Sequence, residues 1–429
     1  KADDVAPEPG GFRPITLLNA HYKIVSGCIG GRIKQVLPDL IDSTQTGFVP
    51  GRLIFENLTF TRDILEWART THNPLYIAFL DFEKAFDRVD WWYRNEVLRV
   101  LGFPSSLIHM INALYHEASL QLLINGELSD SIAQTRGVRQ GCPISPFIFA
   151  MFIEPLGELM RDHKRELGVY LPKPRTHSTS QYALLTSFAD DSTLYSNEEG
   201  KLVRALELVT SEFCVASGAK LNEEKTRILS TIRDDSDIQS RLQARYLKGS
   251  DWVKSLGGIY SENIKATDRF DTVIHKIKLR MIRLQHRKPS LAARVLYSNT
   301  LLSSCLWYFA YFIPPSPTQV TQFDALVKGM LWSKVPGETK APVIINMARM
   351  SACKDAGGQG VLMPSDMIPA IQADMVDRAL RGRGKWWSIF LDIFLESAMP
   401  SYKGVDALLS TSTSIPTEAL CVLGCGSAQ

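Results

Sequence analysis

The sequence lacks the features of disulfide-rich, repetitive or membrane-spanning proteins. Its seven cysteines are odd in number, scattered and never spaced as Cys-x-x-Cys, which argues against a disulfide framework or a complete zinc site. No repeat or low-complexity tract occurs, the first residues form no basic and apolar signal segment, and the longest aromatic run, residues 306–313, is too short to span a bilayer. We therefore expect a folded intracellular protein without a membrane segment.

An excess of charge of one sign is also missing. The net charge of +3 over 429 residues is too small to indicate a nucleic-acid partner, although the 45% hydrophobic content supports a sizeable core and more than one domain. Positive charge is concentrated in residues 265–294, where only Asp268 and Asp271 are acidic. On helices these cations could hold a nucleic-acid backbone through its phosphates, or they could be an ordinary solvated face. The candidate contacts are Lys276, Lys278, Arg280, Arg283 and Arg287.

Two short apolar runs end in carboxylates. Residues 75–80 lead to Asp81, and residues 182–189 lead to Asp190 and Asp191, after which an apolar segment resumes. Adjacent acids on a turn are usually solvated, but acids beside a core are costly unless a cation or a partner neutralises them. Because carboxylates from separate strands are the hard ligands that divalent metals prefer, we predict a two-metal phosphoryl-transfer site at these acids.

The remaining pattern predicts a mixed α+β fold. Residues 91–101 have helical spacing with Asp90 as N-cap, residues 125–126 (Asn-Gly) predict a hairpin turn, and residues 147–160 form a strongly apolar helix. Residues 164–180, rich in Pro, Lys, Arg, Ser and Thr, predict an exposed loop or insertion. Helices and strands therefore alternate without the regular order of a parallel α/β fold.

Several ordered motifs resemble those of reverse transcriptases. Residues 188–191 (Phe-Ala-Asp-Asp) resemble motif C, residues 80–87 motif A, and residues 136–146 motif B as non-LTR elements have it. Further blocks resemble fingers segments, motif D, the block near the primer grip and the connection beyond the thumb, in residues 12–19, 45–52, 218–226, 256–259 and 357–360. Together they are far more specific than any one alone. Over residues 11–370 the chain is similar to a non-LTR (LINE-type) retrotransposon reverse transcriptase, and we expect it to be a fragment of a longer polyprotein.

This resemblance implies an α+β right-hand polymerase with fingers, palm and thumb. Residues 1–74 would form part of the fingers and the entry to the palm, residues 75–260 the palm with its antiparallel or mixed sheet, residues 261–330 a helical thumb, and residues 331–429 a C-terminal connection region of unassigned role. The implied activity is RNA-directed DNA polymerisation, a nucleotidyl transfer that extends a DNA primer with dNTPs on an RNA template. Two Mg²⁺ ions, or Mn²⁺ in their place, would serve the reaction. Nucleus and cytoplasm are the expected locations.

The resemblance also implies roles for single residues. Asp81 and Asp190 would ligate both metals, with Asp191 a neighbouring acid of the same motif. Phe86 would exclude ribonucleotides by contact with the 2′-hydroxyl, its alternative being core packing. The next two candidates, Gln140 and Gly141, would support template and nucleotide, or form a plain turn.

Two cations complete the expected nucleotide site. Arg13 would contact the triphosphate, and Lys225 would act as an acid when pyrophosphate leaves. Either could instead be a solvated surface cation.

Rival interpretations remain. A group II intron maturase is the nearest rival enzyme, although motif B and residues 45–52 fit the retrotransposon better; Phe86 disfavours an RNA-directed RNA polymerase. A rival of another class is an inert RNA-binding remnant of such an element. No segment resembles an endonuclease, and Cys421 with Cys425 only hints at a Cys/His knuckle.

Overall fold

The structure, a computed structural model, describes residues 16–174, 181–232, 245–246, 252–261, 268–287, 289–313, 315–332, 345–381 and 386–398. The chain divides into two compact units. Unit 1 comprises Lys1–Asn57, Leu65–Leu171 and Gln181–Glu262, and unit 2 comprises Leu58–Ile64, Pro172–Ser180 and Asn263–Gln429. The expected assignment of fingers, palm, thumb and connection stays a prediction.

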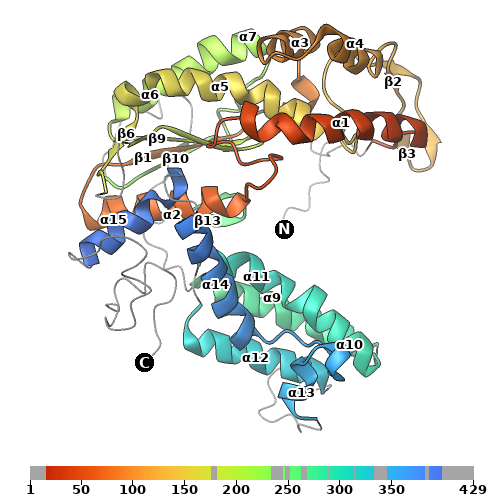
Figure 1. The fold of residues 1–429 in the computed structure, drawn as a ribbon, viewed down its shortest axis with the longest axis vertical. Coiled ribbons are helices and arrows are strands. Elements are labelled where there is room, and N and C mark those ends of the chain that lie inside the picture. Colours follow the sequence, from red (N-terminus) through yellow and green to blue (C-terminus); the bar gives the residue numbers. More distant parts are fainter. Residues whose placement is uncertain are drawn as a thin grey trace. The chain divides into compact units, whose positions relative to one another are not determined.

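A five-stranded mixed sheet forms the centre of unit 1 (Figure 1). Its order is β11 (Arg245–Tyr246), β10 (Arg227–Ser230), β1 (Tyr76–Leu80), β9 (Asp191–Ser196) and β8 (Leu185–Phe188). Strand β1 is antiparallel to both of its neighbours, β8 is antiparallel to β9, and β11 alone runs parallel to its partner. All five residues of β1 are buried, as an apolar run covered on both faces requires. The predicted strand before Asp81 and the predicted mixed sheet are confirmed.

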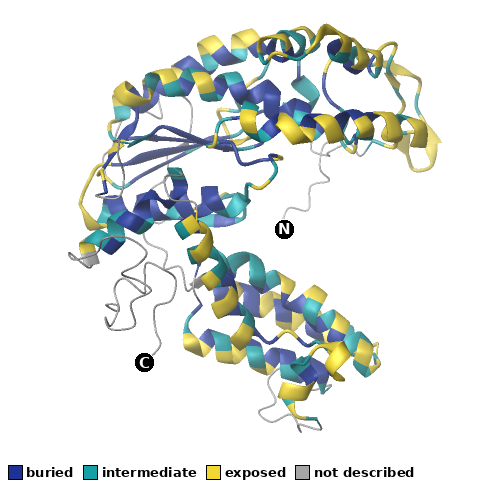
Figure 2. Ribbon diagram, in the orientation of Figure 1, coloured by how far each residue is buried: buried dark blue, intermediate teal, exposed yellow. Residues whose placement is uncertain are grey.

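Helices α5 (Ser145–Leu167) and α6 (Glu199–Leu208) cover one face of this sheet (Figure 1). Their apolar side chains share a core with residues of β1, β9 and β10, and Figure 2 shows the strands buried almost throughout. Helix α6 continues through the π-helical turn η3 (Val209–Cys214) into α7 (Val215–Ser217). The sheet is thereby held against these two helices, and its strand ends are left for function.

The remaining described elements up to residue 260 surround this sheet and its helices. They are α1 (Ala20–Leu40), α2 (Ile54–Thr70), η2 (Ala85–Arg88), α3 (Trp91–Val100), α4 (Ser105–Ala113), β2 (Ser119–Leu120), β3 (Leu123–Ile124), β4 (Glu127–Leu128), β5 (Ile132–Ala133), β6 (Val169–Leu171), β7 (Gln181–Ala183), β12 (Val253–Ser255) and β13 (Gly258–Tyr260). The Asp90 side chain caps α3 by accepting from the Tyr93 amide at 2.8 Å, as predicted. Asn125 and Gly126 both have positive φ, 52° and 92°, in the turn between β3 and β4, so the predicted hairpin is confirmed.

Two expectations from the sequence are wrong. The proposed loop at residues 164–180 begins too early, because α5 runs to Leu167 and β6 follows, with Leu167, Val169 and Leu171 all buried. Lys164 and Arg165 are exposed in the last turn of α5, where basic side chains are favourable, and residues 175–180 of the proposed loop lie outside the described residues. The run 182–189 is also not one strand, because β7 pairs with β6 whereas β8 pairs with β9.

Unit 2 is helical where it is described. Its elements are α9 (Asp268–Gln285), α10 (Leu291–Tyr297), η4 (Ser298–Leu302), α11 (Ser304–Ala310), α12 (Pro317–Leu331), α13 (Met347–Ser351), η5 (Lys354–Ala356), α14 (Pro364–Arg381), η6 (Trp386–Ser388) and α15 (Ile389–Ala398). Phe270 of α9 packs edge-on against Phe309 and Phe323, with ring centroids 6.4 and 6.1 Å away. Among the described residues, no helix has the length and apolar character needed to cross a membrane.

Candidate active site

Strand register brings the predicted carboxylates to one end of the sheet. In the β1–β9 pair, Leu80 lies opposite Ser192, so the next residue of each strand places Asp81 opposite Asp191. In the β8–β9 pair, Phe188 lies opposite Asp191, which leaves Ala189 and Asp190 as a two-residue turn. Asp81 and Asp190 are partly exposed and Asp191 is exposed. Asp81 therefore meets the adjacent pair Asp190 and Asp191, more than 100 residues further along the chain, where solvent can reach all three.

This donor set fits a divalent cation that is only partly enclosed by protein. No group of three or more His, Cys, Asp or Glu residues is arranged to hold a metal within the described part of the chain. Magnesium is commonly held by one or two carboxylates together with phosphate oxygens and water, not by an all-protein cage. The carboxylates at the ends of β1 and β9 suit that kind of site.

The backbone around Asp81 is held by the segment that carries Lys225. The Asn222 amide donates to the Asp81 carbonyl oxygen at 2.7 Å, and the Glu83 amide donates to the Lys220 carbonyl oxygen at 2.8 Å. Lys220 also forms an ion pair with Glu83 at 3.0 Å, and the hydrogen bond and charge of this lysine lower the pKa of Glu83. Lys225 is exposed, and its amide donates to the Asn222 side chain. The motif D segment is thereby tied to the strand end that bears Asp81.

Three phenylalanines lie beside the carboxylates. Phe86 is partly exposed and stacks on Phe149 of α5, with centroids 4.3 Å apart. The Phe48 ring is 39% exposed and meets Phe86 edge-on at 6.2 Å and Phe188 at 6.4 Å. One face of Phe86 is therefore packed while the ring keeps some exposure, which is compatible with either predicted role.

The loop with Gln140 and Gly141 is joined to the segment of Phe86. The Val138 amide donates to the Phe86 carbonyl oxygen at 2.8 Å, and the Gly137 amide donates to Val89 at 2.7 Å. Gly141 has a φ of +93° within a turn closed by a bond from the Cys142 amide to the Arg139 carbonyl. Gly141 therefore lies in a turn, and this turn belongs to the segment that is hydrogen-bonded to the backbone of Phe86, the residue proposed to exclude ribonucleotides.

The remaining candidates belong to unit 2 or lie outside the described residues. The five cations proposed for nucleic-acid binding lie in unit 2, on α9 or just beyond it, and all are exposed. None of the five forms an ion pair with another described residue, although Arg280 donates to the Leu301 carbonyl oxygen at 3.1 Å. Arg13, Cys421 and Cys425 lie outside the described residues.

Sequence reasoning missed a second ladder next to the turn. The Ser187 amide donates to the Thr44 carbonyl oxygen, and the Thr46 amide donates to the Ser187 carbonyl oxygen, each at 2.9 Å. Gln45 thus pairs in parallel with Ser187 of β8. Residues 45–52 stand out in sequence as a family-like block, but nothing in the block itself indicates this contact.

Comparison with known proteins gives a consistent answer. A family model described as reverse transcriptase (RNA-dependent DNA polymerase) matches residues 1–259, more than half of the chain. The Transposon TX1 uncharacterized 149 kDa protein of Xenopus laevis is 29% identical, over 86% of this chain and 27% of its own length. The Pol polyprotein from type-2 retrotransposable element R2DM of Drosophila melanogaster is 27% identical, over 51% of this chain and 20% of its own length. The chain therefore spans only about a quarter of these curated relatives.

A solved structure of apo telomerase from Candida tropicalis, truncated from the C-terminal domain, also aligns. Its TM-score is 0.40 at 15% sequence identity, over 56% of this chain and 44% of that chain. A likeness of this degree does not bear on substrate or partner.

Proposed function

The chain belongs to the reverse transcriptase (RNA-dependent DNA polymerase) family, and on that premise we propose that it extends the 3′-hydroxyl of a DNA primer on an RNA template. Its fold is that of a right-hand polymerase with mixed helices and sheet, and its relatives include polyproteins of non-LTR retrotransposable elements. The observation that best supports the activity is the register that sets Asp81 opposite Asp191, with Asp190 in the adjoining turn. This is the carboxylate placement that phosphoryl transfer requires.

Members of this family use divalent metal ions, and we assign Mg²⁺ to Asp81 and Asp190, with Asp191 contributing negative charge beside them. When bound, such ions favour ionisation of the primer hydroxyl and neutralise the charge of the leaving pyrophosphate. The strands hold the carboxylates, and Asn222 fixes the backbone of Asp81. The protein thereby orients the groups before the nucleotide arrives.

Neighbouring residues select and place the nucleotide in this proposal. The Phe86 ring contacts the sugar and disfavours a 2′-hydroxyl by steric exclusion. Gln140 and Gly141 support the template base and the nucleotide, Arg13 contacts the triphosphate, and Lys225 donates a proton to the departing pyrophosphate. The cations of α9 hold the phosphate backbone of primer and template without reading sequence.

A biological role and a location are part of the same proposal. Since the relatives are proteins of retrotransposable elements, we propose that DNA synthesis by this chain serves retrotransposition in the nucleus, with the protein also present in the cytoplasm.

The test is Mg²⁺-dependent extension of a DNA primer annealed to an RNA template, with dNTPs or rNTPs supplied separately. We expect extension with dNTPs and little with rNTPs. A folded sample that binds the primer–template but extends it under no condition would instead support the inert RNA-binding remnant.

A further inference from the structure

The turn between β8 and β9 has a backbone conformation that needs outside support. Ala189 has a φ of +57°, a left-handed value that is unfavourable for a residue with a Cβ. Strain of this kind persists only where surrounding contacts determine it. Because Asp190 is the next residue of this two-residue turn, any shift of the Ala189 backbone moves the Asp190 carboxylate.

The side-chain amide of Gln45 supplies that support. Its Nε2 donates to the Ala189 carbonyl oxygen at 3.2 Å, and its Oε1 accepts from the Ala189 amide at 2.9 Å. The same Oε1 accepts from the Gly47 amide at 2.8 Å. Gln45 and Ala189 are 4% and 3% exposed, so water does not readily replace these bonds. Both backbone groups of Ala189 are thus bound by one residue that is 144 positions away.

Gly47 allows this close approach. A Cβ at Gly47 would lie 2.2 Å from the Ala189 nitrogen and 2.9 Å from the Phe188 carbonyl carbon. These are backbone atoms that cannot move aside without shifting the turn itself. Only glycine fits at this position.

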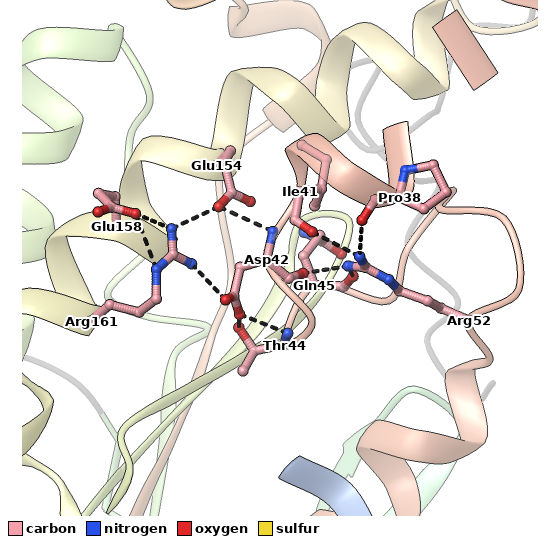
Figure 3. Close-up of polar contacts among 9 residues, drawn as sticks. All are labelled: Pro38, Ile41, Asp42, Thr44, Gln45, Arg52, Glu154, Glu158 and Arg161. Atoms are coloured by element: carbon pink, nitrogen blue, oxygen red, sulfur yellow. Dashed lines mark hydrogen bonds and ion pairs between the residues drawn. The ribbon is translucent and has the colours of Figure 1, made fainter. Parts of the chain in front are cut away.

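Arg52 fixes the segment that carries Gln45. Its guanidinium donates to the carbonyl oxygens of Gln45 at 2.8 Å, Ile41 at 2.7 Å and Pro38 at 2.9 Å, and also to that of Asp42 (Figure 3). Pro38 and Ile41 lie at the C-terminal end of α1, where carbonyl groups lack helical partners and a positive charge is favourable. One side chain therefore joins the end of α1 to the backbone of Gln45.

A second network ties the same segment to α5. Asp42 accepts from the Thr44 amide and hydroxyl at 2.8 and 2.7 Å, and its amide donates to Glu154 at 3.2 Å. Arg161 forms ion pairs with Asp42 at 3.4 Å and Glu154 at 2.8 Å, and also with Glu158 (Figure 3). The two networks thus hold the backbone that leads from the end of α1 to Gln45.

We propose that Gln45 is a positioning residue of the polymerase, which holds Ala189 and thereby Asp190 in place, and that Arg52 in turn holds Gln45. This rests on the proposed polymerase function. Gln45 touches neither the nucleotide nor the metal in this account. Its effect is on the rate of the chemical step and on metal affinity, with little effect on the KM for dNTP.

Unit 2 offers a matched control. Asn299 uses the same chemistry, donating to the Gly360 carbonyl oxygen at 2.8 Å and accepting from the Leu362 amide at 3.1 Å. The backbone that it holds carries no residue of the proposed site. Gln45→Met removes the two bonds to Ala189 and the one from Gly47, and Asn299→Leu removes two bonds of the same kind. Both substitutions preserve side-chain size approximately.

The experiment measures single-turnover dNTP incorporation, the KM for dNTP, thermal unfolding, and the Mg²⁺ concentration that gives half-maximal thermal stabilisation. We expect Gln45→Met to slow incorporation roughly 10- to 100-fold and to raise that Mg²⁺ concentration, with the KM for dNTP changed by less than about threefold. Asn299→Leu should lower the melting temperature but leave incorporation within about twofold of wild type. Arg52→Lys, a milder change, should shift the incorporation rate and the Mg²⁺ response in the same direction as Gln45→Met. It replaces Gln45→Met in the experiment if the Gln45→Met protein does not fold.

Two results would overturn the inference. One is a folded Gln45→Met or Arg52→Lys variant with wild-type incorporation and Mg²⁺ response; the other is an equal rate loss in Asn299→Leu. If wild type itself does not extend a primer, the polymerase proposal fails, and the inference is then decided by whether Gln45→Met still weakens stabilisation by Mg²⁺.

Discussion

Units 1 and 2 use similar polar side chains for different ends. In unit 1, Gln45 binds the backbone of a turn that bears a candidate metal ligand, and Arg52 binds the backbone of Gln45. In unit 2, Asn299 and Arg294 bind backbone groups in the same way, with Arg294 donating to Pro289 and Leu331, but the backbone they hold lies at a helix end or between helices. Hydrogen bonds from a side-chain amide to the backbone therefore affect stability in both units, but they affect nucleotide incorporation only in unit 1. The exposed cations of α9 suit unit 2 for contact with the phosphate backbone of a nucleic acid.

The largest expected effect is on the rate of nucleotide incorporation when an acid of unit 1, but not of unit 2, is replaced. Asp81→Asn should slow nucleotide incorporation by roughly 1,000-fold, because several kcal/mol of charge stabilisation is lost in the transition state. The control is Asp324→Asn in unit 2, whose Oδ1 accepts from the Ser365 amide at 3.0 Å. That variant should incorporate nucleotide at close to the wild-type rate. Equal losses of incorporation rate in Asp81→Asn and Asp324→Asn would show that the acids of unit 1 have no special role in the reaction.

The next effect concerns choice of sugar. Phe86→Ala should lower the preference for dNTP over rNTP by roughly 10- to 200-fold, the range for loss of one pocket contact, measured as the ratio of kcat/KM values. Phe82→Ala is the control, because Phe82 is 7% exposed and packs on Phe213 in the core. We expect it to lower the melting temperature without changing the ratio. If Phe86→Ala behaves like this control, the role of Phe86 is packing alone.

Charge on unit 2 should change binding by a smaller factor. The double variant Lys276→Ala with Arg283→Ala should weaken primer–template binding severalfold and flatten its dependence on salt, as loss of phosphate contacts requires. Arg378→Ala is a matched control, because Arg378 is exposed but already paired with Asp374 at 2.8 Å. Binding measured by fluorescence anisotropy over a salt series distinguishes the two. An unchanged salt slope in the double variant would make α9 an ordinary solvated face.

The smallest effect is a pH dependence within the network around Gln45. Burial opposes ionisation of Asp42, but hydrogen bonds from Thr44 and the charges of Arg161 and Arg52 outweigh it and lower its pKa. The stability that ionised Asp42 contributes is therefore present at neutral pH and is lost as pH falls below about 4. Asp42→Asn should cost about 1 kcal/mol or less at pH 7, and the difference from wild type should shrink in acid.

The pKa of Glu154, in the same network, is shifted in the opposite direction to that of Asp42. Burial raises its pKa, despite the hydrogen bond and charge of Arg161. The contribution of Glu154 to the stability of the fold is therefore greatest in acid, and it declines as pH rises through the pKa of Glu154 in the folded protein. Chemical denaturation of Asp42→Asn and Glu154→Gln across pH 3–7 should give opposite slopes relative to wild type, and parallel curves would contradict the assignment.

The sequence was most informative where a signal is local. The cap at Asp90 and the turn at Asn125 and Gly126 could be predicted because each depends on neighbouring residues only. The strand before Asp81 could be predicted from its apolar run. The loop proposed at residues 164–180 began too early, because composition hid the buried positions of Leu167 and Val169.

The support for the candidate site could not be predicted in the same way. The bonds from Gln45 to Ala189 join residues 144 positions apart, and the carbonyl contacts of Arg52 require the end of α1 to be in place first. A polar residue in a motif block gives no sign of which backbone group it will bind. Tertiary packing decides this, so the motif indicated the carboxylates but not what holds them.

The most direct test of the central claim is single-nucleotide incorporation by wild type and Asp190→Asn at saturating primer–template and Mg²⁺, with binding measured in parallel. Wild type should incorporate dNTP, and Asp190→Asn should bind primer–template as wild type does but react roughly 1,000-fold more slowly. Incorporation by Asp190→Asn at the wild-type rate would contradict the central claim, because the carboxylates at the end of β1 and β9 would then not carry the chemistry.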